Sequence, residues 1–415
     1  MDQYTPRQDT PAKPLKPARV ALNVLALCFA LSVLGRGLGE SFTVFLKPIS
    51  DEFGWDRAEV VSVYSLTWLA GGLTAPVVGR LFDRFGPRMV YSLGLLLLGG
   101  AFLTAAYAQS LWQFRLCIGL CVGLGIALIG NVPNSILLGR WFGPRLPTAM
   151  AVMYSATGAG IWILLPASQV LIDRIGWRDA YQLFGIVALC LLLPLLFLPW
   201  RLFATGAPHV VRKADTSVTD EGWTLAGAMR HHAFWALFCT FFFTAVAMYS
   251  ITAQIVAFLI DAGFTPLQAA TAWGFSGIVV FIGMLGVSTL DGIIGRRPSV
   301  LFSYGVSIVG IILLWLIQWY PNFWLLTGFV VCFGSMIGSR GPLITATALK
   351  IFRGKRVGTI FGTISIGAGL GSAIGSWSGG LIHDFSHSYN PLIAFSLVNV
   401  VLGMIPFLVV PALRR

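Results

Sequence analysis

Two charged residues of opposite sign stand one helical turn apart in an otherwise apolar segment near the N-terminus. Arg36 and Glu40 lie in the stretch SVLGRGLGESFTVF. Residues at i and i+4 share a helix face, so these two can form an ion pair. If Glu40 takes up a proton in a low-dielectric site, Arg36 is freed for an anion, which couples a proton to an anion. Two other interpretations stay open: the charges only neutralise each other, or one of them contacts a ligand directly.

The composition indicates which kind of helix holds this pair. The chain has 415 residues, of which 56% are hydrophobic and 11% charged, and its mean hydropathy is +0.81. A soluble protein of this length could not hide so much apolar surface. Twelve long apolar runs, beginning with residues 20–46, are each long enough to cross a bilayer. The sequence therefore predicts an all-α membrane protein with twelve transmembrane helices.

The net charge of +12 comes from the segments between the apolar runs. If both termini are cytoplasmic, most Lys and Arg lie in cytoplasmic segments, whereas the opposite loops carry many of the acids. This is the positive-inside distribution, and it explains the basic charge without a nucleic-acid partner. The six cysteines all fall in apolar runs without zinc-ligand spacing, so we expect neither a disulfide framework nor a metal site. The expected location is the inner (plasma) membrane.

The sequence weakly repeats itself at an offset of about 209 residues. The segment EFGW at 52–55 falls on DAGF at 261–264, and GAG at 158–160 falls on GAG at 367–369. Two six-helix bundles in the same orientation are therefore predicted. The expected organisation is a disordered cytoplasmic tail (1–19), an N-terminal bundle (20–200), a cytoplasmic linker (201–232) and a C-terminal bundle (233–412).

The loop after the second run carries a motif with a counterpart in the second half. The stretch GRLFDRFGPRMV contains Gly79, Asp83, Arg84, Gly86 and Arg88, and STLDGIIGRRP contains Asp291, Gly295 and Arg297. The first stretch resembles the signature of major facilitator transporters between their helices 2 and 3. Together with the parallel six-helix repeats, this resemblance implies a twelve-helix transporter with a site near the midplane between the halves. These residues are expected to form a gate, in which Asp291 stands one place off the register of Asp83.

A narrower resemblance rests on about 30 residues around the opening pair, including TVFLKPISDEFGWDRAEVVS. This region is similar to monocarboxylate porters and the related oxalate/formate exchangers. Two departures matter. Glu40 occupies the place where animal monocarboxylate porters carry a lysine, and the run 272–290 lacks the arginine that the eighth helix of those porters uses for the substrate carboxylate. Carboxylate binding is therefore not simply inherited.

Arg340 is the best candidate to replace the missing arginine. The 209-residue offset places it opposite Asn131, each two residues before a proline. An intramembrane ionisable residue is a functional candidate by default, and a guanidinium matches a carboxylate. A structural pairing of Arg340 is the alternative. Further polar candidates, each equally suited to a helix–helix hydrogen bond, are Asn134, Tyr154, Tyr249 and Gln254.

These features favour a secondary transporter over an enzyme. We expect proton-coupled uptake of a small organic anion by alternating access, in a monomer that uses no cofactor. Two alternatives remain: a proton antiporter that exports drugs or metabolites, and a receptor that binds a ligand without moving it. The substrate, the direction and the coupling ion are not fixed by the sequence.

Overall fold

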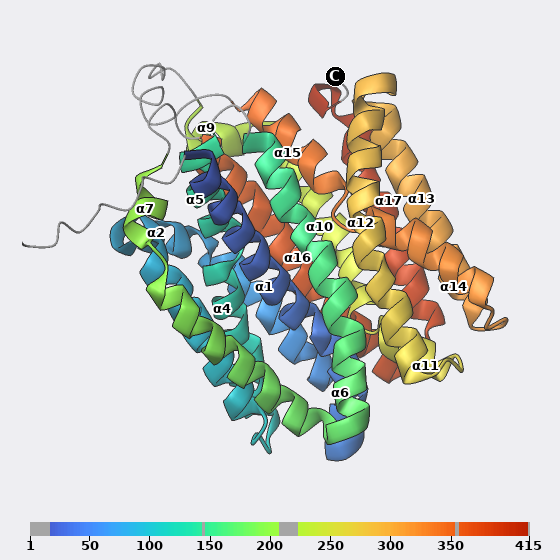
Figure 1. The fold of residues 1–415 in the computed structure, drawn as a ribbon. Coiled ribbons are helices and arrows are strands. Elements are labelled where there is room, and N and C mark those ends of the chain that lie inside the picture. The colour runs from blue at the N-terminus through green and yellow to red at the C-terminus, as the bar shows by residue number, and fades with distance from the viewer. Residues whose placement is uncertain (1–16, 143–145, 207–222, 353–356, 414–415) are drawn as a thin grey trace, which may run out of the picture.

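The computed structural model describes residues 17–142, 146–206, 223–352 and 357–413, and within these ranges the regular structure is helical throughout (Figure 1). Most of the predicted tail, residues 1–16, and the middle of the predicted linker, residues 207–222, lie outside the described residues.

The first half of the chain forms one set of helices. Its elements are α1 (Pro17–Phe53), α2 (Arg57–Ala105), α3 (Leu111–Phe114), the π-helical η1 (Arg115–Val122), α4 (Gly123–Ile129), α5 (Asn131–Phe142), α6 (Leu146–Phe197) and α7 (Trp200–Thr205). α1 is longer than the predicted run 20–46 because the helix continues past Pro48, well beyond the apolar core of the run.

The second half forms the other set. Its elements are α9 (Leu225–Arg230), α10 (His232–Thr252), α11 (Ile255–Asp261), α12 (Pro266–Ile294), α13 (Arg296–Ile317), α14 (Phe323–Phe329), the π-helical η3 (Val330–Gly334), α15 (Arg340–Ile351), α16 (Val357–Ser386), α17 (Asn390–Val409) and the short η4 (Pro411–Leu413).

These elements make twelve crossings of the bundle. α2 and α6 each cross twice, because Gly86 (φ 76°) and Gly176 (φ 82°) adopt a backbone conformation that reverses the chain and that L-residues avoid. The short helices combine into single crossings: α3 to α5, α10 with α11, and α14 to α15. In the described residues, nine helices are long and apolar enough to span a membrane, one of them being the doubled segment of 46 residues in α6.

The two halves repeat local backbone features at the offset seen in the sequence. Gly54 and Gly263 both have positive φ, 64° and 105°, and Gly86 and Gly295 have 76° and 87°. A π-helical segment interrupts the fourth crossing of each half, as η1 and η3. The weak repeat in the sequence therefore has a backbone counterpart at its turns and interruptions.

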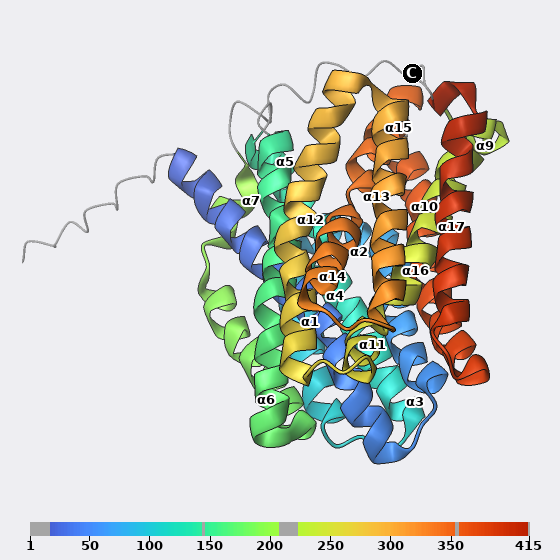
Figure 2. The same ribbon diagram turned by 90° about the vertical axis from the view of Figure 1, so that its right-hand side faces the viewer.

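Both views show the same two ends of the bundle. α5, α9, α15 and the C-terminus lie at one end, which we call the terminal end, and α11 lies at the other, which we call the distal end (Figures 1 and 2). Two apolar cores fill the interior, one drawn almost wholly from residues 20–203 and the other almost wholly from residues 228–413.

Glycines allow the two halves to touch along their length. A Cβ on Gly158 of α6 would lie 1.9 Å from the carbonyl oxygen of Gly277 on α12, so these helices meet backbone to backbone. On the other side of the interface, a Cβ on Gly72 of α2 would lie 3.3 Å from the Cα of Gly369 on α16. Small residues of this kind are what brings helices together in a bilayer.

A second stripe of glycines on α16 packs within the second half. Gly367, Gly371, Gly375 and Gly379 lie four residues apart, and a Cβ on any of them would come within 2.3–2.8 Å of a backbone oxygen of α10. α10 and α16 are therefore held in direct contact, and this stripe is not part of the interface between the halves.

Candidate functional site

The predicted pair on α1 is present in the structure. The Nη2 atom of Arg36 lies 3.6 Å from Oε1 of Glu40, with 23% of the arginine side chain exposed and 5% of the glutamate. The pair is thus an ion contact longer than an ordinary hydrogen bond. The carboxylate is almost wholly enclosed, whereas the guanidinium is still partly open to the interior of the bundle.

The other carboxylate oxygen of Glu40 accepts a hydrogen bond from α2. The hydroxyl of Tyr64 donates to Oε2 at 2.7 Å. A buried carboxylate is costly unless it is paired and hydrogen-bonded, and here one oxygen faces a cation and the other a hydroxyl. Either contact changes when Glu40 gains a proton.

Aromatic rings enclose Arg36 from both halves. The guanidinium carbon lies 4.5 Å from the ring centroid of Trp68, a cation–π arrangement, and the Trp68 ring lies 5.3 Å from that of Tyr249 on α10. Tyr249 also interacts electrostatically with Arg36 and Glu40. We call Arg36, Glu40, Tyr64, Trp68 and Tyr249 the central cluster. It joins α1 and α2 of the first half to α10 of the second.

One donor of the central cluster has no acceptor. The Nε atom of Arg36 is buried and has no hydrogen-bond partner among the described residues. An unpaired buried donor on a cation is costly and is suited to an incoming acceptor. An anion that reached the open side of the guanidinium could supply one.

The three glycines around Arg36 serve close packing of α1. A Cβ on Gly37 would lie 2.2 Å from a methyl carbon of Leu164 on α6, and a Cβ on Gly39 would lie 2.8 Å from Ile126 on α4. α1 is therefore clamped between two neighbours, which fixes the height and rotation of the charged pair.

Arg340 lies elsewhere, inside the second half. It is 2% exposed, and its Nε and Nη2 atoms donate to the hydroxyl and the carbonyl of Ser303 at 3.0 and 2.7 Å. Nη2 also donates to Ser307, and the guanidinium carbon lies 4.0 Å from the ring centroid of Tyr304. In the described part of the chain its polar partners thus all belong to α13. Contact of Arg340 with a substrate stays a prediction.

Asn134 occupies a comparable place in the first half. Its amide nitrogen donates to Ser32 at 2.9 Å and to the carbonyl of Ile129 at 3.0 Å, and Tyr91 donates to its oxygen at 2.8 Å. In each half, therefore, a polar side chain that follows the π-helical segment contacts a tyrosine of the third crossing. Asn134 contacts Tyr91 in the first half, and Arg340 contacts Tyr304 in the second. These contacts correspond to the helix–helix alternative that the sequence left open.

The remaining polar candidates are not brought together. Asn131 and Tyr154 are exposed side chains on α5 and α6. Gln254 is buried at the break between α10 and α11, and neither polar atom of its side chain has a partner among the described residues. Contact of these three residues with a substrate stays a prediction.

The predicted gate residues lie at the turns of the terminal end. Gly86 and Gly295 make the turns. A Cβ on Gly79 of α2 would lie at an ordinary 3.8 Å from a methyl carbon of Val132. The exposed residues are Asp83, Arg84, Arg88 and Arg297. In the second half, Asp291 pairs with Arg296 at 3.3 Å, and Arg296 also donates to Thr347 at 2.9 Å. The gate role of these residues stays a prediction.

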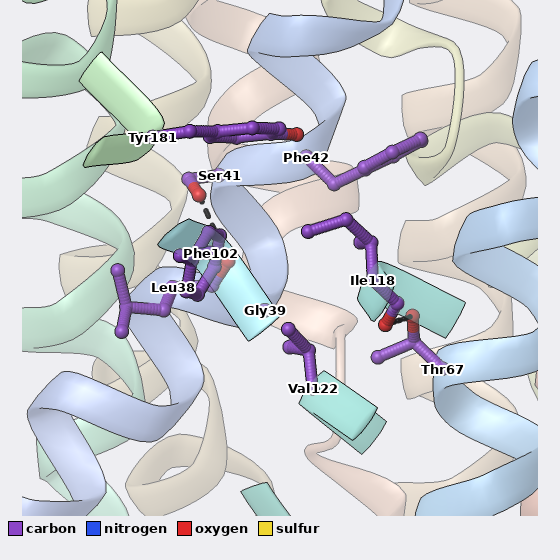
Figure 3. A pocket seen from close by; sticks show the side chains of 9 residues that line it. All are labelled: Leu38, Gly39, Ser41, Phe42, Thr67, Phe102, Ile118, Val122 and Tyr181. Atoms are coloured by element: carbon purple, nitrogen blue, oxygen red, sulfur yellow. Dashed lines mark hydrogen bonds between the residues drawn. The ribbon is translucent and has the colours of Figure 1, made fainter. Parts of the chain in front are cut away.

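A small cavity lies beside the central cluster but inside the first half. Its lining comes from Leu38, Gly39, Ser41, Phe42, Thr67, Phe102, Ile118, Val122 and Tyr181 (Figure 3). The hydroxyls of Ser41 and Thr67 donate to the backbone oxygens of Leu38 and Ile118, at 2.8 and 3.1 Å, so they are already satisfied. The cavity is mostly apolar and offers no charge to a substrate.

Sequence reasoning missed two members of the central cluster. Tyr64 and Trp68 stand four residues apart on α2, the same spacing as Arg36 and Glu40 on α1. That spacing places both rings on one helix face and was the available signal.

Comparisons with known proteins agree with this architecture. The family model described as Major Facilitator Superfamily matches residues 25–376. The chain is 25% identical over 403 residues to the uncharacterized MFS-type transporter YcxA of Bacillus subtilis (strain 168), covering 93% of this chain and 95% of that protein.

Monocarboxylate transporters are also similar to the chain. Monocarboxylate transporter 3 of Rattus norvegicus is 26% identical over 395 residues, which cover 92% of this chain and 77% of the relative. Monocarboxylate transporter 11 of Homo sapiens is 32% identical over 178 residues, which cover 41% of this chain and 38% of the relative. The helical bundle, the family match and these relatives lead to one conclusion: the chain belongs to the Major Facilitator Superfamily and is a multi-pass membrane transporter with the twelve-helix fold, not an enzyme.

Proposed function

We propose that this transporter carries a small organic anion together with a proton, by alternating access, and that the central cluster is its substrate and proton site. The observation that carries the proposal is the Arg36–Glu40–Tyr64 arrangement between the halves. It combines a partly open cation with an enclosed carboxylate.

Arg36 is the group that meets the anion. Its guanidinium carries an unpaired Nε donor and is held in place by the ring of Trp68. A fixed fork of donors suits a carboxylate, and a bidentate pair is stronger than a point-charge contact. The names of the monocarboxylate transporters support a carboxylate as the anion.

Glu40 is the group that carries the proton. When Glu40 is ionised it competes with a substrate anion for Arg36 at 3.6 Å. Once protonated, it no longer neutralises Arg36 and retains Tyr64 as a neighbour. The anion then binds favourably only when Glu40 is protonated, and symport requires this coupling. Arg36 thus exchanges one anionic partner, the Glu40 carboxylate, for another, the substrate anion, and the net charge of the central cluster is unchanged.

Tyr249 makes the site sensitive to the relative position of the halves. It comes from α10, whereas the charged pair comes from α1, so any rocking of one half against the other changes its contact with Arg36. The gate residues at the terminal end would control access from that side. The excess of Lys and Arg in the segments at that end supports a cytoplasmic location for it in a plasma-membrane protein. One chain encloses the site, so a monomer suffices.

Uptake by proteoliposomes tests this function. A panel of labelled mono- and dicarboxylates is offered with and without an inward proton gradient, to the parent, to Arg36→Ala and to Arg36→Lys. We expect one carboxylate to accumulate only with the gradient and both variants to lose at least tenfold in uptake, since lysine cannot reproduce the fork. Arg178→Ala, an arginine paired with Glu52 away from the central cluster, is the control and keeps uptake.

Uptake by Arg36→Ala equal to that of the parent would overturn the assignment of the site. If no carboxylate moved in any variant, the anion assignment itself would fall, and cationic drugs in the export direction would be the next panel.

A further inference from the structure

A network of charges joins the two halves at the distal end. Asp261, the last residue of α11, accepts hydrogen bonds from Lys47 of α1 at 3.0 Å and from Arg57 of α2 at 2.5 Å. The hydroxyl of Tyr389 also donates to Asp261 at 2.8 Å and contacts Arg57. A single carboxylate of the second half therefore holds the ends of two helices of the first half.

A second carboxylate acts on the same helix end. Oδ2 of Asp384 on α16 accepts the backbone N–H of Ala58 at 2.5 Å. Ala58 lies in the first turn of α2, where backbone N–H groups lack partners within the helix and the helix dipole favours a negative charge. On the same chain segment, the N-cap residue Asp56 and Glu59 in the first turn form a capping box. The first turn of α2 is thus capped partly by its own residues and partly by the opposite half.

Close packing continues beneath these carboxylates. A Cβ on Gly380 would lie 2.8 Å from the Cα of Ala58, so α16 touches the start of α2 directly. Two turns further in, the hydroxyls of Ser65 and Ser376 are 2.7 Å apart and buried. The distal end is therefore closed by charge at the surface and by small side chains below it.

Among the residues that the structure describes, the ion pairs of the terminal end differ from those of the distal end. There the ion pair of Asp291 with Arg296 stays within the second half, and Asp83 is exposed. Ion pairs across the interface are seen at the distal end only, within the described ranges. The structure therefore corresponds to a conformation whose distal end is held shut.

We propose that Asp261 and Asp384 form a two-point latch that keeps the central cluster closed at the distal end, and that release of this latch opens the cluster to that side. The proposal rests on alternating access as set out under the proposed function. The side chains of Lys47, Arg57 and Asp261 are between a fifth and a third exposed. Such partly buried, charge-assisted contacts are stronger than surface pairs yet can still be broken during a cycle.

Asp384 also has a titratable neighbour. Nδ1 of His383 lies 3.7 Å from Asp384, its ring lies 4.6 Å from that of Tyr389, and Arg57 and Asp261 face the same place. The labelling experiment below is run at a fixed pH of 7.5, so that the protonation state of His383 does not vary between samples.

Reactivity of a cysteine beneath the latch tests the proposal without any transport. Ser376→Cys places a thiol in the sealed layer, and the full-length protein is held in lipid nanodiscs, where a maleimide reaches both ends. Labelling of that site is quantified by mass spectrometry, so the native cysteines do not interfere. We expect Asp261→Asn and Asp384→Asn each to raise the labelling rate of Ser376→Cys about tenfold or more.

Glu52→Gln is the matched control. Glu52 forms an ion pair at the same end, 2.6 Å from Arg178, but both residues belong to the first half. Its loss leaves the labelling rate unchanged if the latch acts across the halves. An equal rise in Glu52→Gln, or no rise in Asp261→Asn and Asp384→Asn, would overturn the proposal.

A charge swap keeps the test decisive if a single variant is poorly folded. Arg57→Asp alone should speed labelling, and Arg57→Asp with Asp261→Arg should slow it again by restoring a pair. Failure of the swap to slow labelling, in a protein that remains monodisperse, counts against the latch. Because no uptake is measured, a wrong substrate assignment and a wrong latch give different results.

Discussion

Three glycines of α12 allow the roles of the interface and of the bundle core to be separated with one kind of substitution. A Cβ on Gly277 would lie 2.1 Å from the oxygen of Gly158 in the other half, and a Cβ on Gly283 would lie 1.9 Å from the oxygen of Ser335 in the same half. Gly286 has no heavy atom within 4 Å of such a Cβ. Alanine at the three positions adds the same methyl group to three environments.

The structure sets the size of each effect. Ordinary contact begins near 3.4 Å, so Gly283→Ala requires the backbones of α12 and η3 to separate by about 1.5 Å inside one core. Overpacking of this kind costs about 1–3 kcal/mol and lowers Tm by roughly several degrees. Gly277→Ala requires a similar separation, but between halves that can move as bodies. It should therefore leave Tm nearly unchanged and impair transport.

Two measurements on purified protein check the three alanine variants. Thermal unfolding followed by tryptophan fluorescence gives Tm, and proteoliposome uptake of the carboxylate found in the panel gives transport. We expect Gly283→Ala to lose stability, Gly277→Ala to lose transport and Gly286→Ala to lose neither. If Gly277→Ala transported as well as Gly286→Ala, the backbone contact between α6 and α12 would have no part in the cycle and the reasoning would be refuted.

Three further predictions concern stability. Arg340→Lys leaves the carbonyl of Ser303 or the hydroxyl of Ser307 without its donor. We therefore expect the free energy of unfolding to fall by about 1–3 kcal/mol, measured as a lower Tm. Equal stability would contradict the packing of Arg340 against α13. Gly295 has φ 87°, so Gly295→Ala should lower the free energy of unfolding by about 1–2 kcal/mol. Gly305→Ala is the control, because a Cβ there would have no heavy atom within 4 Å, and it should leave stability unchanged. Equal Tm values for the two variants would show that alanine is not strained at this turn. His231 accepts the N–H of Ala233 at 3.2 Å through Nδ1, and burial with the neighbouring His232 lowers its pKa. Its neutral form therefore stabilises the start of α10 above the ordinary histidine pKa, and this stability is lost as the pH falls below about 6.5. His231→Asn, which can cap without titrating, should show a smaller fall of Tm between pH 7.5 and 5 than the parent.

The sequence predicted the helices well because their signal is local. Long apolar runs and glycine turns are visible within tens of residues, and the ion pair of Arg36 with Glu40 follows from a spacing of four on one helix. α2 and α6 each contain two of the predicted runs, which meet at Gly86 and Gly176, where the backbone is not helical and the chain reverses.

Contacts between distant helices were not predictable in the same way. Asp261 lies more than 200 residues from Lys47 and Arg57, and nothing in the charge pattern of a loop states which loop it faces. The direction of Arg340 depends on rotation of α15 about its axis, which the π-helical η3 and the following turn at Gly338 determine. Spacing fixes which residues share a face, whereas neighbours decide where that face points.

Coupling of the proton to the anion through Glu40 is tested most directly by Glu40→Gln. The variant keeps the shape of the side chain and the contact with Tyr64 but cannot ionise, so it never forms the ion pair with Arg36 and never carries a proton. Proteoliposomes are measured for exchange of internal against external labelled carboxylate and for accumulation under an inward proton gradient, with Glu52→Gln beside them. We expect Glu40→Gln to exchange the carboxylate and fail to accumulate it, while Glu52→Gln does both. Accumulation by Glu40→Gln with the parent's dependence on the gradient would contradict the assignment of Glu40 as the proton carrier.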